Sequence, residues 1–218
     1  MPAWSFLEIG VLVSALVGAA GLGLSLRRTA AFGRREPFAR AAGKAGEGVR
    51  FFFTAGMLPR HKESARDHAL VYLAGVLYHG GIFLALLGLF LGLFRVPVPA
   101  VAARAAGWVV LAALAAGLGL LVKRVVTPGT RRLSVPDDFL SNFLVDLFLA
   151  GCLLASVDPA WGTPAGIAAI VLFLYAPLGK IRHCAYFFVS RLTLGAFFGR
   201  RGVYPPKPSP APGPQVNP

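Results

Sequence analysis

The segment Ala69–Phe94 reads ALVYLAGVLYHGGIFLALLGLFLGLF and contains no Asp, Glu, Lys or Arg. A helix needs about 20 mostly apolar residues to cross the hydrocarbon core of a bilayer. A stretch of this length without a charged side chain is therefore predicted to be a membrane-spanning helix. It carries one histidine, His79, about ten residues from its start.

Four further segments have the same apolar character, and together the five predict an all-α, integral membrane five-helix bundle over residues 1–202. The long loop 27–66 is expected on the cytoplasmic side, with the apolar stretch Gly48–Phe53 along the membrane interface. The proline-rich residues 203–218 are expected to form a disordered tail. The five helices are expected at about 6–26, 69–94, 105–122, 139–157 and 161–190.

Composition supports a membrane protein over soluble classes. The 218 residues are 56% hydrophobic and 14% charged, whereas a soluble domain carries about 25% charged residues. The net charge of +13 would suit a nucleic-acid partner. Long uncharged runs need lipid around them, however, so no nucleic-acid partner is expected. Cys152 and Cys184 are too few for a disulfide framework or a four-cysteine zinc site.

The positive charges divide unequally between alternate connections. The connections after the first, third and fifth segments hold ten, four and six Lys or Arg residues, which is 20 of the 22. The opposite side holds only Arg95 and Arg104. By the positive-inside rule, the N-terminus is expected outside and the C-terminus in the cytoplasm.

Two histidines suggest a haem site. His79 lies within the second apolar segment, and His183 follows the fifth at a similar depth if that helix continues past Pro177. Two histidines on different helices are what a bis-imidazole haem b requires, because the iron takes one neutral imidazole on each face. Gly75 and Gly80, with the adjoining Gly81, would let a flat porphyrin approach the backbone.

Lys180 and Arg182 are expected to pair with the haem propionates near the membrane surface. The alternative interpretation needs no haem. In that case His79 hydrogen-bonds a neighbouring helix, and His183 is an ordinary interfacial residue.

Three motifs carry a family resemblance. They are Tyr78-His79-Gly80-Gly81-Ile82, then Lys123-Arg124-Val125-Val126-Thr127-Pro128 with Arg131 and Asp138, then Pro177-Leu178-Gly179-Lys180-Ile181-Arg182-His183. With these motifs, the region from about Ala69 to Arg191 resembles the cytochrome b (gamma) subunit of respiratory nitrate reductase. It also resembles relatives of that subunit in heterodisulfide-reductase-like and sulfite-reduction-associated membrane complexes.

The resemblance implies a haem b subunit in the cytoplasmic (inner) membrane of a bacterium or archaeon. Such a subunit transfers electrons, in either direction, between the quinone or menaquinone pool and a cytoplasmic iron–sulfur partner subunit. It belongs to a quinol:acceptor oxidoreductase and has no complete active site of its own. His79 and His183 match the ligands of the haem nearer the cytoplasm.

The chain departs from the family at the second haem. The positions of the two outer-haem ligands are occupied by Leu89 and Ala165. A complete ligand pair is missing, so one haem b is predicted. His68 lies eleven residues before His79 on nearly the same helix face. A second haem held by His68 is the alternative. The expectation for this residue is a propionate, proton or quinone contact, or a place in a helix cap near Ser64.

Asp146 stands near the middle of the fourth segment and shares a helix face with Asp138 and Asn142. A proton relay or quinone contact is one interpretation, and a neutral carboxyl hydrogen-bonded between helices is the other. Two further functions stay open for the whole chain. One is a cofactor-free membrane anchor for a cytoplasmic partner, and the other is a small proton or ion carrier that uses Asp146 and His79.

Overall fold

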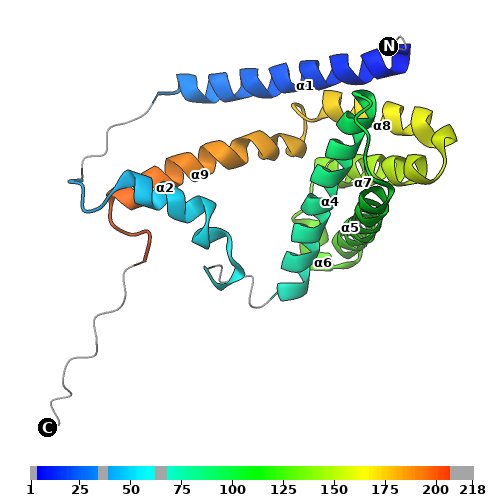
Figure 1. Ribbon diagram of the computed structural model, residues 1–218. Coiled ribbons are helices and arrows are strands. Elements are labelled where there is room, and N and C mark those ends of the chain that lie inside the picture. The colour runs from blue at the N-terminus through cyan, green and yellow to red at the C-terminus, as the bar shows by residue number, and fades with distance from the viewer. Residues whose placement is uncertain (1–3, 34–38, 62–67, 207–218) are drawn as a thin grey trace, which may run out of the picture. The chain divides into compact units, whose positions relative to one another are not determined.

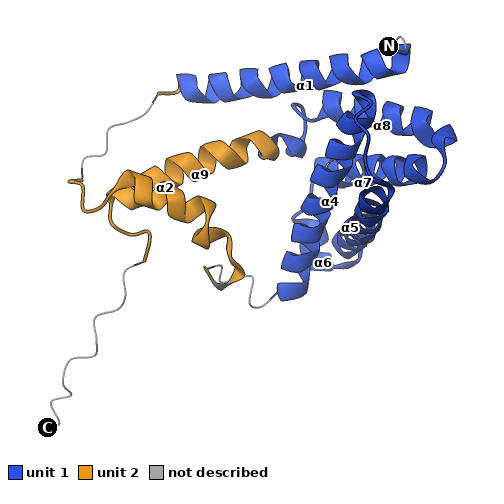
Figure 2. Ribbon diagram, in the orientation of Figure 1, with its two compact units in different colours: residues 1–31, 67–183 blue, residues 32–66, 184–218 orange. Residues whose placement is uncertain are grey.

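The computed structural model describes residues 4–33, 39–61 and 68–206, and every regular element among them is a helix (Figure 1). The described chain divides into two compact units (Figure 2), of which unit 1 comprises residues 1–31 and 67–183 and unit 2 comprises residues 32–66 and 184–218. The α-helices are α1 (Phe6–Ala31), α2 (Ala45–Phe53), α4 (Ala69–Leu93), α5 (Ala100–Val126), α6 (Pro128–Arg132), α7 (Pro136–Val157), α8 (Gly162–Tyr175) and α9 (His183–Arg200). Short 3₁₀ helices are η1 (Ala55–Met57), η2 (Pro59–His61), η3 (Pro159–Trp161) and η4 (Lys180–Arg182).

Four helices of unit 1 are long and apolar enough to cross a membrane. They are α1, α4, α5 and α7, with 26, 25, 27 and 22 residues. A fifth span results, within the described residues, if α8 and α9 are counted together. Large apolar side chains such as Phe83 and Trp108 are exposed on unit 1, where lipid would cover them. The chain therefore has the architecture of a multi-pass, all-helical membrane protein.

Three of these helices are longer than hydropathy predicts. The first ends at Ala31 instead of near residue 26, and the third spans Ala100–Val126 instead of about 105–122. Hydropathy limits stop at the first charged residue, but charged side chains at a helix end reach the interface and do not interrupt the helix. Arg28 and Arg124 lie in such last turns, where the helix dipole also favours cations.

The fifth apolar stretch is not the continuous helix expected over about 161–190. α8 ends at Tyr175, and a new helix begins only at His183, after the 3₁₀ turn η4. Pro177 is the physical cause, because it has no N–H to donate and its ring clashes with the preceding helical turn. Gly179 then takes an extended backbone conformation (φ −102°, ψ −164°). α8 alone is about 21 Å long, too short for a hydrocarbon core of about 30 Å.

The helices of unit 1 alternate in direction. α1 and α8 run parallel, because Gly166 lies against Leu7 near their starts and Gly21 lies against Pro177 near their ends. At the start of α1, Glu8 pairs with Arg95 beyond the end of α4, with 3.1 Å between Oε1 and NH2. The consequence is an up-and-down order in which α1, α5 and α8 point one way and α4 and α7 the other.

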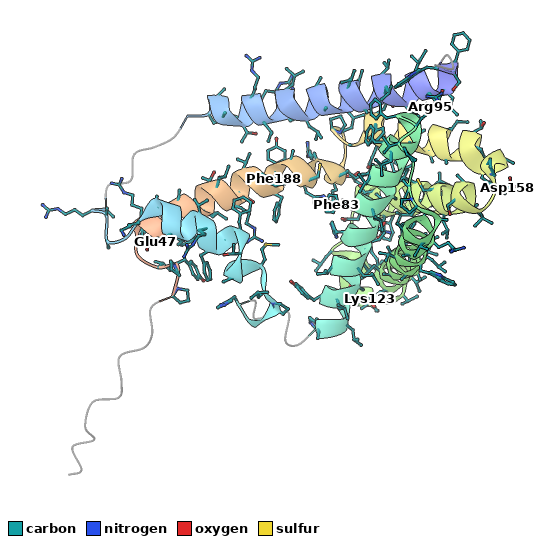
Figure 3. The ribbon with its side chains drawn as sticks, viewed as in Figure 1. Glu47, Phe83, Arg95, Lys123, Asp158 and Phe188 are labelled. Carbon is teal, nitrogen blue, oxygen red and sulfur yellow. The ribbon has the colours of Figure 1, made fainter. Side chains whose placement is uncertain are left out.

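One end of unit 1 collects most of its positive charge, and we call it the basic end. It is the end where α5 finishes, where α4 and α7 begin and where the turn η4 follows α8, and Lys123 marks it in Figure 3. Arg95 lies at the opposite end in the same view. The basic residues of unit 1 on the elements that form this end are Lys123, Arg124, Arg131, Arg132, Lys180 and Arg182.

Small residues let the helices of unit 1 approach closely, as is usual in membrane bundles. A Cβ added to Gly18 of α1 would collide with the backbone of Phe173 in α8. A Cβ on Gly81 of α4 would collide with the Cβ of Ala113 in α5. Phe148 of α7 is fully buried among these contacts. Shape complementarity between backbones, and not large side chains alone, therefore builds this core.

Unit 2 consists mainly of α2 packed on α9. Gly48 lies against the backbone of Gly195 and Gly199, and rings of Phe52 and Phe198 stack with centroids 6.2 Å apart. The expected apolar segment at 48–53 is thus part of a helix, and its location along the membrane interface stays a prediction. Of the tail expected over 203–218, residues 207–218 lie outside the described residues.

Candidate functional site: a pair of facing histidines

His79 is exposed on the surface of α4, within an apolar membrane-spanning helix. Its Nδ1 lies 2.7 Å from the carbonyl oxygen of Gly75, one helical turn earlier. A carbonyl oxygen only accepts hydrogen bonds, so Nδ1 is the donor in this contact and Nε2 is the nitrogen that remains to bind a metal when the ring is neutral. Metal-ligating histidines have this arrangement almost always, with the other ring nitrogen donating to a carbonyl or carboxylate.

His183 repeats this arrangement on a different element. It is the first residue of α9, it is exposed, and its Nδ1 lies 2.7 Å from the carbonyl oxygen of Lys180. Nδ1 is again the donor, and Nε2 is the nitrogen that remains to bind a metal when the ring is neutral. The turn η4 positions this ring, so the break after Pro177 is part of how the site is built.

The two imidazole rings lie beside one another. Their centroids are 6.0 Å apart and their planes are inclined at 76°. Two metal–imidazole bonds of about 2 Å each, extended to the ring centres, separate two axial ligands of one ion by about 6 Å. The observed centroid spacing is thus of the size expected for two axial imidazoles of one metal ion.

The two histidines supply two nitrogen donors to a metal ion. Within residues 4–33, 39–61 and 68–206, no group of three or more His, Cys, Asp or Glu side chains gathers to hold a metal. A structural zinc takes four ligands, and catalytic zinc takes three from the protein. A metal ion held by this pair would therefore need further donors from a bound group, and the four equatorial nitrogens of a haem are one such set.

The glycines near His79 divide into two kinds. A Cβ added to Gly75 or Gly80 would meet no heavy atom within 4 Å, so the surface there is open to a flat ligand. Gly81 differs, because a Cβ added to it would collide with the Cβ of Ala113 in α5. Gly81 thus serves helix packing and does not belong to the open surface, contrary to the expectation from sequence.

Lys180 makes a contact that the sequence did not predict. Its Nζ donates to Oδ1 of Asp138, and NH1 of Arg124 lies 3.4 Å from the same oxygen. The side chain of Asp138 is almost buried, while that of Lys180 is about half exposed. Arg182, the other expected propionate partner, is exposed. Lys180 therefore forms an ion pair with Asp138, whereas the side chain of Arg182 is exposed.

His68 is the residue before α4 and lines a groove at the basic end with Lys123, Arg124 and Lys180. His61, the other histidine available for a second haem, belongs to unit 2 and packs its ring against Phe51 at 5.3 Å. The structure thus groups His68 with cations rather than with a second ligand.

Asp146 is buried and enclosed by partners from its own helix and from α4. Tyr78 donates its hydroxyl to Oδ1 at 2.8 Å, and the amide of Asn142 donates to Oδ2 at 2.8 Å. The same amide lies 3.3 Å from the carbonyl oxygen of Gly117 in α5. Both carboxyl oxygens are satisfied, and this favours the structural interpretation of Asp146 over a relay or quinone contact.

A second polar contact at the start of α7 was missed from the sequence. Tyr175, the last residue of α8, donates its hydroxyl to Asp137, and Ser141 lies 3.3 Å from the same carboxylate oxygen. Asp137 and Asp138 together tie the end of α8 and the turn η4 to α7. The sequence did contain a signal for these contacts. Asp137 and Asp138 are adjacent acids in the first turn of one predicted membrane helix, and Tyr175 and Lys180, which can donate to them, lie near the end of the next.

Leu89 and Ala165, the two positions at which the sequence analysis expects no haem ligand, both pack within unit 1. Ala165 of α8 is buried, and a Cβ added to Gly151 of α7 would lie 3.0 Å from its Cα. Leu89 of α4 packs against the hydrophobic core.

Comparisons with protein-family models, curated proteins and solved structures find no match to this chain.

Proposed function

We propose that this chain is the haem b membrane subunit of a respiratory oxidoreductase, similar to the gamma subunit of nitrate reductase. It would transfer electrons between the quinone or menaquinone pool and a cytoplasmic iron–sulfur subunit. The observation that carries the proposal is the pair His79 and His183, whose rings lie 6.0 Å apart with each Nδ1 donating to a carbonyl.

In this proposal His79 and His183 hold the iron through Nε2, and the carbonyls of Gly75 and Lys180 fix the two ring orientations. A bound haem would supply a one-electron iron couple whose potential depends on burial and ligand hydrogen bonds. Phe83, one turn after His79, is exposed on α4 and would help to exclude water. Arg182 is free to pair with a propionate.

One haem b per chain is proposed. Leu89 and Ala165, at the positions of the second ligand pair in the similar family, have no donor atom for iron, and this supports the number. His68 lies among cations, whose charge opposes a further cationic iron centre.

The proposed location is the inner membrane of a bacterium or archaeon, with the N-terminus outside and the C-terminus in the cytoplasm. The alternation of helix direction in unit 1 supports this orientation, since it brings Lys123, Arg124, Lys180 and Arg182 to one end. An iron–sulfur subunit with an acidic surface would dock on this basic end.

The test is a reduced-minus-oxidised optical spectrum of the purified, haem-replete protein. We expect Soret and alpha bands of a b-type cytochrome, and a pyridine haemochrome assay should give about one haem per chain. His79→Ala and His183→Ala should each abolish the bands, because a single axial ligand remains. Both residues are exposed, so the core stays intact.

His68→Ala is the matched control and should keep the full spectrum. Absence of haem bands in the wild-type protein would contradict the proposal and favour a cofactor-free anchor. Retention of the bands in both ligand variants would show that other residues hold the iron.

A further inference from the structure

A groove of about 550 Å³ opens at the basic end of unit 1. Its walls come from the residue before α4, the end of α5, α6, the start of α7 and the turn η4. The groove thus lies where five segments of the bundle meet the membrane surface. Its lining residues are His68, Lys123, Arg124, Thr127, Gly129, Thr130, Leu133, Ser134, Asp138 and Lys180.

The groove carries more positive than negative charge. Lys123, Arg124 and Lys180 face a single carboxylate, Asp138, which is already shared by two of them. Nε of Arg124 is enclosed and has no hydrogen-bond partner among the described residues. A buried donor without a partner is costly, so an added hydrogen-bond acceptor beside this guanidinium would be stabilising.

The cations are supported by small and hydroxyl-bearing residues. Gly129 has no heavy atom within 4 Å of an added Cβ, and Thr127 and Thr130 contribute hydroxyl groups to the lining. Arginine, lysine and hydroxyl donors around an open backbone form a suitable environment for a phosphate group. A neutral quinone carbonyl would leave the excess positive charge uncompensated.

An apolar groove of about 820 Å³ adjoins the basic one, and Ser134 lines both. It lies between α5 and α7, whose exposed faces would contact lipid. The apolar groove can therefore accept hydrocarbon while the basic groove accepts a phosphate. Its lining residues are Leu121, Val125, Arg131, Ser134, Pro136, Phe139, Leu140 and Phe143.

We propose that the two grooves bind one anionic phospholipid, with the phosphate of its headgroup in the basic groove and an acyl chain in the apolar groove. Basic pockets between membrane helices bind anionic headgroups by this combination of charge and hydrocarbon contact. Inorganic phosphate would occupy only the basic groove. The adjoining apolar groove favours a phospholipid as the ligand over a free phosphate ion, because only the lipid has an acyl chain to fill it. This proposal does not depend on the presence of haem.

The experiment titrates the purified full-length chain in detergent with phosphatidylglycerol or phosphatidylcholine of identical acyl chains, and measures each Kd by native mass spectrometry. We expect phosphatidylglycerol to bind at least about tenfold more tightly. Lys123→Gln should weaken that binding about fivefold, the effect of one surface cation on an anionic lipid. Lys123 is exposed, so the variant should fold.

Lys123→Arg keeps the charge and should keep the affinity. Arg132→Gln is the matched control, because Arg132 is exposed at the same end and lines neither groove. Equal affinity for the two lipids, or equal losses in Lys123→Gln and Arg132→Gln, would overturn the proposal.

Two further measurements distinguish other anions. Excess inorganic phosphate should leave lipid binding unchanged, and displacement of the lipid would assign the groove to a free anion. The haem content of Lys123→Gln should equal that of the wild type. A loss of haem in this variant would assign the groove to the propionates and overturn the lipid site.

Discussion

Tyr78 and His79 are neighbours in α4 but belong to different surfaces. Successive helical residues point about 100° apart, so the two side chains cannot face the same way. Tyr78 is turned inward because Asp146 accepts its hydroxyl hydrogen bond, and this rotation of the helix leaves His79 on the outer surface. The buried carboxyl therefore acts on the proposed haem site indirectly, by fixing the rotation of α4.

Gly117 provides a test of this network at the scale of one residue. A Cβ there would collide with Oδ1 of Asp146 and with the ring of Tyr78. Gly117→Ala should destabilise the protein by about 1–3 kcal/mol, as overpacking of a core does. The measurement is thermal unfolding in detergent.

Gly119 of the same helix is the control, since an added Cβ there meets nothing within 4 Å. Gly119→Ala should be neutral or stabilising by up to about 1 kcal/mol, because alanine favours helix. If the two variants unfold at the same temperature, the contact of α5 with the Tyr78–Asp146 pair is not important for stability.

At the scale of elements, the break between α8 and α9 determines where His183 lies. The carbonyl of Lys180 accepts from His183 within the turn η4, and Lys180 is itself held by Asp138 of α7. If α8 continued through residues 176–182, each residue would turn the chain by about 100° around the helix axis. The side chain of His183 would then point in a direction set by that helix and not by η4. The interruption at Pro177 is thus a condition for two facing imidazoles.

Pro177→Ala should allow the helix to extend beyond Tyr175. The restored N–H and the removed ring clash both favour this change. Hydrogen–deuterium exchange over residues 176–183 should become slower, and haem content should fall. Pro128→Ala is the control, because proline at a first helical position is tolerated and its loss alters little. Unchanged exchange after Pro177→Ala would show that Gly179 or the Asp138 contact sets the break.

At the scale of the whole molecule, the charge asymmetry predicts the orientation in the membrane. Val98 follows α4 at the opposite end, and Gly129 lies in α6 at the basic end. In a background with Cys152→Ala and Cys184→Ala, we expect an impermeant maleimide to label Val98→Cys in intact bacterial cells. It should label Gly129→Cys only after permeabilisation. Labelling of Gly129→Cys in intact cells would contradict the proposed orientation.

Much of the architecture was predictable from the sequence. Four of the predicted helices occur as single helices with ends shifted by a few residues. Their ends shift because hydropathy shows which residues are apolar enough for the membrane interior, and not where the helical backbone begins or ends. The fifth was predicted as one helix and is interrupted. Of the expected site, His79 and His183 do lie together, whereas Gly81 does not belong to the open surface and Lys180 is paired with Asp138.

Composition and charge placement were sufficient for the helical membrane class, because burial in lipid demands uncharged runs of a fixed length and needs no knowledge of the partner helices. The approach of His79 to His183, the enclosure of Asp146 and the basic groove depend on residues that are distant in the chain. Asp146 and Tyr78 are 68 residues apart, and Asp138 and Lys180 are 42 apart. Hydropathy describes each segment separately and contains no information on how the helices are rotated against one another. These contacts therefore depend on the tertiary structure, in which helix rotation and close packing bring the segments together.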